Sequence, residues 1–163
     1  MHQLSLFLFL FSIFGNQEPV SEEYRYEYYS NGVVKSKGWI SDSNKKGYWY
    51  FYYPNGRVSK KGHFTNDEKD KYWYFYSQQG QLVKEGHFIK GKAEKWWIIY
   101  DIAEKKENRV TRKYQYKNNK KNGYCLLYRN DKLFKAEKYN NDQKTGEWTD
   151  IFSFKKDNPN ASL

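Results

Sequence analysis

The chain has 163 residues, a length that suits one domain of modest size. Tyr, Phe and Trp make up 21% of it, charged residues make up 29%, and the formal net charge is +10. So many aromatic residues argue against a disordered chain, and a lone cysteine excludes an intramolecular disulfide. The positive charge favours polyanionic partners, unless the lysines serve only to keep the surface soluble.

Residues 1–15 are predicted to be a secretory signal peptide, and residues 16–23 a short linker. From Leu4 to Phe14, nine of eleven residues are apolar. Such a run is too short to cross a bilayer as a helix and has the length of a signal-peptide core. We therefore expect a secreted, periplasmic or cell-envelope protein. An uncleaved membrane anchor is the second interpretation, because no Lys or Arg precedes the run.

Residues 24–152 are predicted to be a repeat domain of about five units. Three kinds of landmark return every 24 residues: a turn dipeptide (Asn31-Gly32, Asn55-Gly56, Gln79-Gly80), a glycine (Gly38, Gly62, Gly86) and a tryptophan (Trp49, Trp73, Trp97). A fixed period of this size indicates one supersecondary unit stacked many times. Stacked units of this kind usually provide binding or scaffolding surfaces.

Each unit is predicted to hold two strands and two turns. The aromatic run Tyr48–Tyr53 favours a strand, and Pro54-Asn55-Gly56 is typical of a turn. Arg57–Phe64 returns as a second strand, and the polar segment Thr65–Lys71 leads to the next unit. No segment shows a helical apolar stripe, so almost no helix is expected outside the leader. The predicted fold is all-β: an elongated, twisted, single antiparallel sheet of stacked β-hairpin repeats.

The register of the hairpins has two possible settings. A two-residue turn at Asn55-Gly56 would pair Trp49 with Gly62, and its equivalent one unit later would pair Trp73 with Gly86. In that register an indole could cover the backbone of a cross-strand glycine. A three-residue turn with a bulge would shift the pairing by one residue.

The repeat weakens after Asp101. The period lengthens around Asp101–Arg109, which we interpret as one enlarged turn. Beyond it, Tyr114 and Glu137 replace the glycine, and Cys125 replaces the tryptophan. Cys125 is therefore predicted to be a buried packing residue. Residues 153–163 are expected to form a polar tail.

The central units resemble a known family. The strings GYWYFYYPNGRVSKKGHF and YWYFYSQQGQLVKEGHF are similar to the bacterial variant of the MORN repeat, and the likeness covers residues 24–152. This resemblance implies a curved or rolled antiparallel sheet that acts as a scaffold or interaction module. Some members of the family are linked to membranes or anionic lipids, and some bacterial relatives are described as antitoxins.

No catalytic, cofactor-binding or metal-binding residue is predicted. The sequence holds no nucleotide-binding glycine loop, no H-E-x-x-H and no cysteine cluster. His63 and His87 occupy equivalent repeat positions, which lie about 9–10 Å apart at the usual strand spacing, too far for one metal ion. Carboxylates such as Asp67 stand in solvated turns, without the cleft that acid–base catalysis needs. We therefore expect no enzyme activity.

Two surfaces are candidates for binding. Strand alternation sends Trp49 and Phe51 to one face and tyrosines to the other. The tyrosines are either interface anchors or merely stack across strands; they are Tyr48, Tyr50, Tyr52, Tyr72, Tyr74 and Tyr76. The second candidate is a row of lysines expected along one sheet edge, either a polyanion site or ordinary solvated turns: Lys45, Lys46, Lys69, Lys71, Lys92, Lys95, Lys120 and Lys121, with Lys144 beyond them.

The predicted function is a non-enzymatic repeat scaffold that mediates protein–protein interaction at or outside the cell envelope. The alternative is peripheral binding to anionic lipid or another polyanion through the lysine row. Sequence-specific nucleic-acid binding is not expected. Salt separates the two functions, because polyanion binding weakens steeply as the salt concentration rises.

Overall fold

The structure, a computed structural model, describes residues 21–102 and 109–161. These residues form one sheet of 11 strands and one short helix. The elements in chain order are β1 (Glu22–Tyr28), β2 (Val34–Ser41), β3 (Asn44–Tyr52), β4 (Val58–Thr65), β5 (Glu68–Tyr76), β6 (Leu82–Ile89), β7 (Lys92–Tyr100), β8 (Val110–Lys117), β9 (Lys120–Arg129), β10 (Lys132–Asn140), β11 (Gln143–Trp148) and α1 (Ile151–Asp157).

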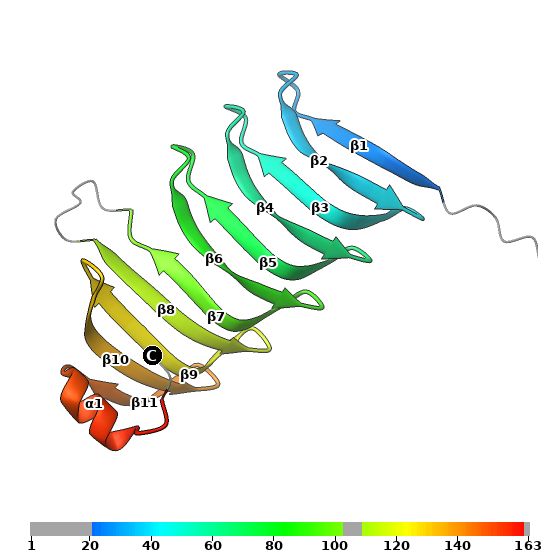
Figure 1. The fold of residues 1–163 in the computed structure, drawn as a ribbon. Helices are drawn as coiled ribbons and strands as arrows, with labels where there is room; N and C mark the ends of the chain where they lie inside the picture. The colour runs from blue at the N-terminus through cyan, green and yellow to red at the C-terminus, as the bar shows by residue number, and fades with distance from the viewer. Residues whose placement is uncertain (1–20, 103–108, 162–163) are drawn as a thin grey trace, which may run out of the picture.

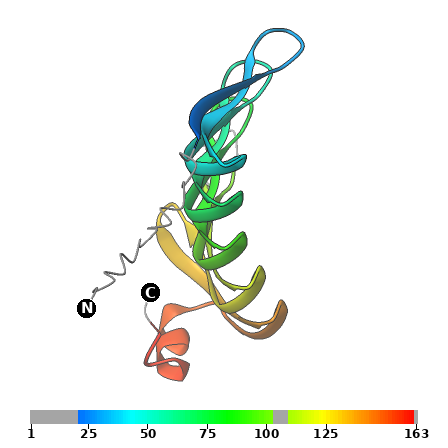
Figure 2. The ribbon, with the colours of Figure 1, turned by 90° about the vertical axis from the view of Figure 1, so that its right-hand side faces the viewer.

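Every strand pairs with the strand before it and the strand after it, so the chain is an antiparallel meander. The sheet is open, with β1 at one edge and β11 at the other. Figure 1 shows the strands side by side along a long axis, and Figure 2 shows how strongly they curve. The predicted all-β sheet of stacked hairpins is confirmed.

The glycine turns adopt the conformation that their sequence predicts. Gly32, Gly56 and Gly80 have φ angles of 79°, 78° and 87°, a region that side chains rarely enter. The first two turns are also tied to the next unit: the hydroxyl of Tyr29 donates to the carbonyl of Tyr52 at 2.8 Å, and that of Tyr53 to the carbonyl of Tyr76 at 2.7 Å. Neighbouring units therefore stabilise one another, as expected of a linear array.

The opposite turns are shorter than predicted. We expected Thr65–Lys71 to be a polar turn, but only Asn66 and Asp67 form it, both at positive φ, and β5 already begins at Glu68. Two consecutive positive φ angles make a tight turn whose twist matches that of the strands. Because the turn is so tight, Lys69 and Lys71 belong to a strand.

The predicted tryptophan–glycine pairing is confirmed, but the turn is not the two-residue turn. The backbone nitrogen of Tyr53 donates to the carbonyl of Arg57 across Pro54-Asn55-Gly56, and a register shift between Phe51 and Tyr52 restores the pairing. Trp49 pairs with Gly62, and Trp73 pairs with Gly86. However, each indole covers the glycine of the preceding strand: a Cβ on Gly62 would lie 2.3 Å from Cδ2 of Trp73. The indole nitrogen of Trp73 donates to the carbonyl of His63 at 3.0 Å, which fixes the ring across that strand.

The tryptophan face is the face of the sheet that carries Trp49, Phe51, Phe64, Trp73, Phe75, Phe88 and Trp97. Trp49 and Trp73 are fully buried on it although no second layer of described residues covers them. Neighbouring rings provide the burial: Phe64 meets the ring of Trp73 edge-on at 5.0 Å. The sheet thus builds its core within one face, from aromatic residues and glycines.

Cys125 is fully buried, as predicted. Cys125 lies on β9 and pairs with Tyr114 on β8 and with Glu137 on β10. At these positions the earlier units pair a tryptophan with glycines. Cysteine is smaller than the tryptophan of earlier units, and the space that this leaves is filled by the side chain of Tyr114, which is larger than their glycine. Burial also raises the pKa of the Cys125 thiol to about 12.

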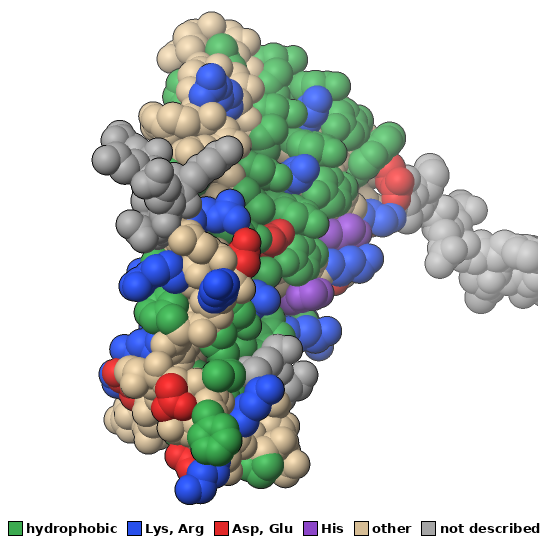
Figure 3. Space-filling view, turned by 60° about the vertical axis from the view of Figure 1, so that its left-hand side comes forward, with side chains coloured by type: hydrophobic (Ala, Val, Ile, Leu, Met, Phe, Trp, Pro, Cys, Tyr) green, Lys and Arg blue, Asp and Glu red, His purple; other side chains and the backbone are tan. Residues whose placement is uncertain are grey.

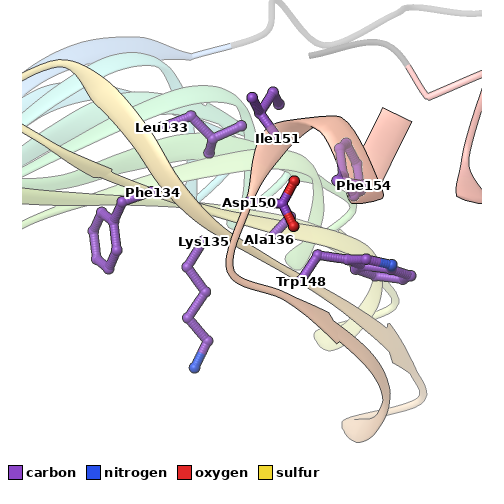
Figure 4. A pocket seen from close by; sticks show the side chains of 8 residues that line it. All are labelled: Leu133, Phe134, Lys135, Ala136, Trp148, Asp150, Ile151 and Phe154. Carbon is purple, nitrogen blue, oxygen red and sulfur yellow. The ribbon is translucent and has the colours of Figure 1, made fainter. Parts of the chain in front are cut away.

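The C-terminal segment differs from the expected polar tail, because residues 151–157 form α1. The side chain of Asp150 caps the helix by accepting from the backbone nitrogen of Ser153 at 2.8 Å. Phe154 is buried against β9, β10 and β11, with its ring edge-on to Trp148 at 5.4 Å. Lys135 projects away from this cluster (Figure 4).

Several predicted segments lie outside the described residues. They are the signal peptide, residues 16–20 of the linker and residues 103–108 of the enlarged turn. The sheet itself begins at Glu22, two residues before the predicted boundary of the repeat domain. Within the described residues, no helix has the length and apolar character needed to span a membrane.

Candidate interaction surface

The tyrosine face is the opposite face of the sheet, which carries Tyr24, Tyr26, Tyr28 and the six tyrosines predicted as an interaction surface. One row of directly paired residues crosses it from strand to strand: Tyr26, Lys37, Tyr50, Lys61, Tyr74, Glu85, Ile98 and Lys113. Rings and charged groups alternate from Tyr26 to Glu85, because tyrosines on β1, β3 and β5 pair with charged residues on β2, β4 and β6; on β7, Ile98 takes the place of the ring.

Two lysines hold the rings of this row apart. The ammonium of Lys37 lies 5.8 Å from the ring centroid of Tyr50 and 5.7 Å from that of Tyr52. A hydrogen bond with the Tyr52 hydroxyl holds the pKa of Lys37 above its usual range. Lys61 repeats this arrangement one unit later, at 5.3 Å from the ring of Tyr74. Both lysines are therefore charged and fixed over aromatic rings.

The charge carried by the row changes from positive to negative at Glu85. Its carboxylate accepts a hydrogen bond from the Tyr100 hydroxyl at 2.5 Å. Burial first, and then the charge of Glu85, raises the pKa of Tyr72 to about 12. The phenols around Glu85 thus stay protonated and can donate hydrogen bonds at neutral pH.

Exposure is greatest at the β1 end of the tyrosine face. Tyr26 is 48% exposed, Tyr28 59% and Trp39 47%, high values for such large rings. Figure 3 shows the resulting band of hydrophobic side chains along the sheet, broken by basic groups and with the histidines at its margin. At the other end, α1 covers Leu126 and Ala136. The face is therefore closed by the helix at one end and open at the other.

His63 and His87 lie on the margin of the tyrosine face. Burial, with the nearby charges of Lys71 and Lys95 respectively, lowers the pKa of each imidazole. His87 meets the ring of Tyr72 edge-on at 4.7 Å. Within residues 21–102 and 109–161, no group of three or more His, Cys, Asp or Glu side chains is placed to hold a metal ion.

The eight lysines that we expected in one row lie near the beginning of β3, β5, β7 and β9. Lys45 turns onto the tryptophan face, 5.3 Å from the ring of Trp49, while the next residue, Lys46, pairs with Glu22 at 2.5 Å. The ammonium of Lys69 lies 5.2 Å from a ring centroid of Trp73, and that of Lys121 lies 4.5 Å from the ring centroid of Tyr114. Because these residues belong to strands, alternation divides their side chains between the two faces, and their role as a polyanion site stays a prediction.

Sequence reasoning missed a cluster of three lysines on the tryptophan face. Lys60 and Lys84 flank Phe75 on the neighbouring strands, and Lys69 lies 5.8 Å from the same ring. The pKa of Lys69 is lowered by burial first and then by the charges of Lys60 and Lys84. No ion pair to these three lysines is formed by any residue in the described part of the chain. Cross-strand register, which the sequence left open, was needed to find this cluster.

Two surface depressions of the described residues each hold two carboxylates, and one of them is lined by Glu23 and Asp42. The other measures about 280 Å³, lies beside the Asn66 turn and includes Glu68 and Asp70 in its lining. Glu68 and its neighbours at the turn are exposed to solvent, and Asp70 accepts a hydrogen bond from Thr65 at 3.3 Å. Acid–base catalysis usually relies on pKa values shifted by burial or by close charges, so this open site carries no argument for an enzyme.

Comparisons of the sequence with models of known protein families and with curated proteins found no match. The function is therefore argued from the chemistry of the two faces.

Proposed function

We propose that the chain is a non-enzymatic, MORN-type repeat module that binds a protein partner through its tyrosine face, at or outside the cell envelope. The observation that carries this proposal is the exposed aromatic band at the β1 end of that face, where Tyr26, Tyr28 and Trp39 are each about half exposed. Contiguous exposed apolar surface in a soluble protein usually marks an interaction site.

The chemistry of the band suits a protein. Tyr and Trp are over-represented among the residues that dominate binding energy, because each combines a large apolar ring with one polar group. The rings are also held in place before binding: the ring centroids of Tyr48 and Tyr50 lie 5.2 Å apart, and those of Tyr72 and Tyr74 lie 5.1 Å apart. Ordering these side chains therefore costs little of the binding free energy.

The charges in the row indicate the kind of partner. Lys37 and Lys61 stand between the rings, Lys113 follows Ile98 further along the row, and Glu85 is the acidic residue of the row. A protein segment with apolar and acidic side chains would complement them. The location outside the cell follows from the predicted signal peptide and is part of the proposal.

A photo-cross-linking residue placed at Tyr50 or Tyr74 tests the proposal in the native host. We expect a recurrent protein adduct from either position, and none from matched positions Lys60 and Lys84 on the other face. The adduct identified by mass spectrometry is then purified and titrated against the chain.

In that titration, replacing Tyr50 and Tyr74 together with alanine should weaken binding at least tenfold, since interface tyrosines often contribute about 2 kcal/mol each. The double variant Lys60→Ala/Lys84→Ala should bind normally. Adducts from the lysine positions alone, or equal affinity of both double variants, would refute the proposal.

A second candidate function is binding of an anion on the tryptophan face. The three lysines around Phe75 favour it, because their mutual repulsion in a half-buried site would be relieved by a phosphate or carboxylate. Binding of anionic vesicles would have to weaken steeply with salt and disappear in Lys60→Ala/Lys84→Ala. The Tyr50→Ala/Tyr74→Ala variant should leave it unchanged.

A further inference from the structure

The edge strand β1 has a sequence that is complementary to itself. Reading outward from Tyr26, an arginine precedes it and a glutamate follows it, and a tyrosine stands one step further on each side: Tyr24, Arg25, Tyr26, Glu27 and Tyr28. An antiparallel copy centred on Tyr26 would set Arg25 against Glu27 twice and Tyr24 against Tyr28 twice. Opposite charges and aromatic pairs directly across two strands are stabilising.

No described residue pairs with the outer side of β1. β1 is the first strand of the sheet and pairs only with β2 among the described residues. All seven of its residues are exposed. A long exposed edge presents unpaired N–H and C=O groups to another strand, and proteins usually protect it. β1 has no proline and no lysine, and the charges of Arg25 and Glu27, which would repel an unmatched strand, would be matched by the same residues of a second copy.

We infer that β1 pairs with β1 of a second copy of the chain, antiparallel and centred on Tyr26. This inference does not depend on the proposed function. The two-fold axis then runs perpendicular to the sheet, so that each face of one copy continues into the same face of the other. The rings of Tyr24, Tyr26 and Tyr28 would contact their counterparts along one side and keep their outer surface on the joined tyrosine face.

Other registers fit less well. Centring on Arg25 sets Glu23 against Glu27, so like charges meet. A shift by one residue joins the tyrosine face of one copy to the tryptophan face of the other. Centring on Tyr24 also pairs Arg25 with Glu23, but it sets Tyr26 against Glu22 and leaves Tyr28 outside the pair. In the Tyr26 register, Arg25 exchanges Glu23 of its own chain for Glu27 of the second copy, while Glu27 also accepts a hydrogen bond from the Ser36 hydroxyl.

Pairing of β1 with β11 of another copy is the alternative that would produce open filaments. β11 is shorter than β1, with 6 residues against 7. Its Glu147 already pairs with Lys135 at 3.0 Å and with Lys144. Its end leads straight into α1, which packs against β10 and β11. The geometry therefore favours a closed dimer.

A charge exchange tests the pairing with the full chain. We expect the native protein to be a dimer by sedimentation analysis over a concentration series. Arg25→Glu alone and Glu27→Arg alone should each raise the dimer dissociation constant about tenfold or more, because each creates two like-charge pairs. The double exchange Arg25→Glu/Glu27→Arg should restore the native value. Circular dichroism checks that all variants keep the sheet.

Cysteine cross-linking tests the register. Because Cys125 is buried, Tyr26→Cys should form a disulfide only between two copies, whereas Tyr50→Cys on the same face should not. A mixture of Tyr24→Cys and Tyr28→Cys chains should yield the mixed dimer. A monomer at all concentrations, open-ended growth, no rescue by the double exchange, or cross-linking of Tyr24→Cys to itself would each overturn the inference.

Discussion

Replacing Gly62 with alanine should destabilise the protein, although alanine normally favours folding over glycine. A Cβ at this position would lie 2.3 Å from Cδ2 and 2.5 Å from Cγ of Trp73, closer than atoms approach in proteins. The neighbour is a rigid ring with no exposed surface, held by a 3.0 Å hydrogen bond to the carbonyl of His63. The ring can therefore make room only by leaving its site.

The magnitude follows from three terms. Overpacking a filled site costs about 1–3 kcal/mol, and loss of the indole hydrogen bond costs about 1 kcal/mol. The reduced entropy of the unfolded chain returns about 0.4–1 kcal/mol. We expect Gly62→Ala to lower the free energy of unfolding by about 2 kcal/mol, when the terms are taken at their central values.

Urea unfolding followed by far-UV circular dichroism measures this loss, and a double-mutant cycle assigns it. Once Trp73 is alanine, the added methyl group meets no ring. Gly62→Ala should then be neutral or slightly stabilising, which makes the coupling energy between the two sites about 2 kcal/mol. If Gly62→Ala is neutral with Trp73 present, or equally costly without it, the steric reasoning is wrong.

Three further predictions concern stability and reactivity. Phe154→Ala should cost about 3–5 kcal/mol as a buried aromatic truncation, whereas Phe152→Ala, at a site 78% exposed, should be nearly neutral in the same urea assay. Cys125, whose pKa is raised to about 12, should resist thiol reagents at pH 8 until urea unfolds the chain. His63 and His87 should titrate below 6.5 by NMR. Because their folded pKa values are lowered, the free energy of unfolding should fall as pH drops below 6.5 and level off below the folded values.

The repeat period predicted the architecture well because the landmarks lie where the backbone needs them. Turn glycines require positive φ, and the buried tryptophans need a glycine beside them, so both recur at fixed spacing. Local sequence was sufficient here because a hairpin is a local structure. The register itself stayed open, because the bulge between Phe51 and Tyr52 that sets Trp49 against Gly62 has no sign in the sequence.

The lysine row could not be predicted in the same way. Its placement depended on whether Thr65–Lys71 was a long turn or a tight turn followed by a strand. Asn66 and Asp67 both take positive φ, which shortens the turn to two residues and sends Lys69 to the tryptophan face. The polar composition of the segment concealed this change, because exposed strand residues are as polar as turn residues.

The C-terminal helix was missed for a related reason. Its seven residues are too few to show a helical period, and the free energy that forms it comes from burial of Phe154. The contacts of Phe154 with Tyr124 and Trp148 come from strands that the worn repeats identify poorly. A lone apolar residue in a polar tail gives no local sign of these partners.

The two faces of the sheet divide the roles of stability and binding. On the tryptophan face, each indole fills the space above a glycine, and that face forms its core without a second layer. The tyrosine face is therefore not needed to bury the main core, and its rings remain partly in water at the β1 end. A sheet that covered both faces with itself or with helices would have no such surface. Because the core lies on one side only, changes to Tyr50 or Tyr74 can alter binding while the fold persists, which makes the two functions experimentally separable.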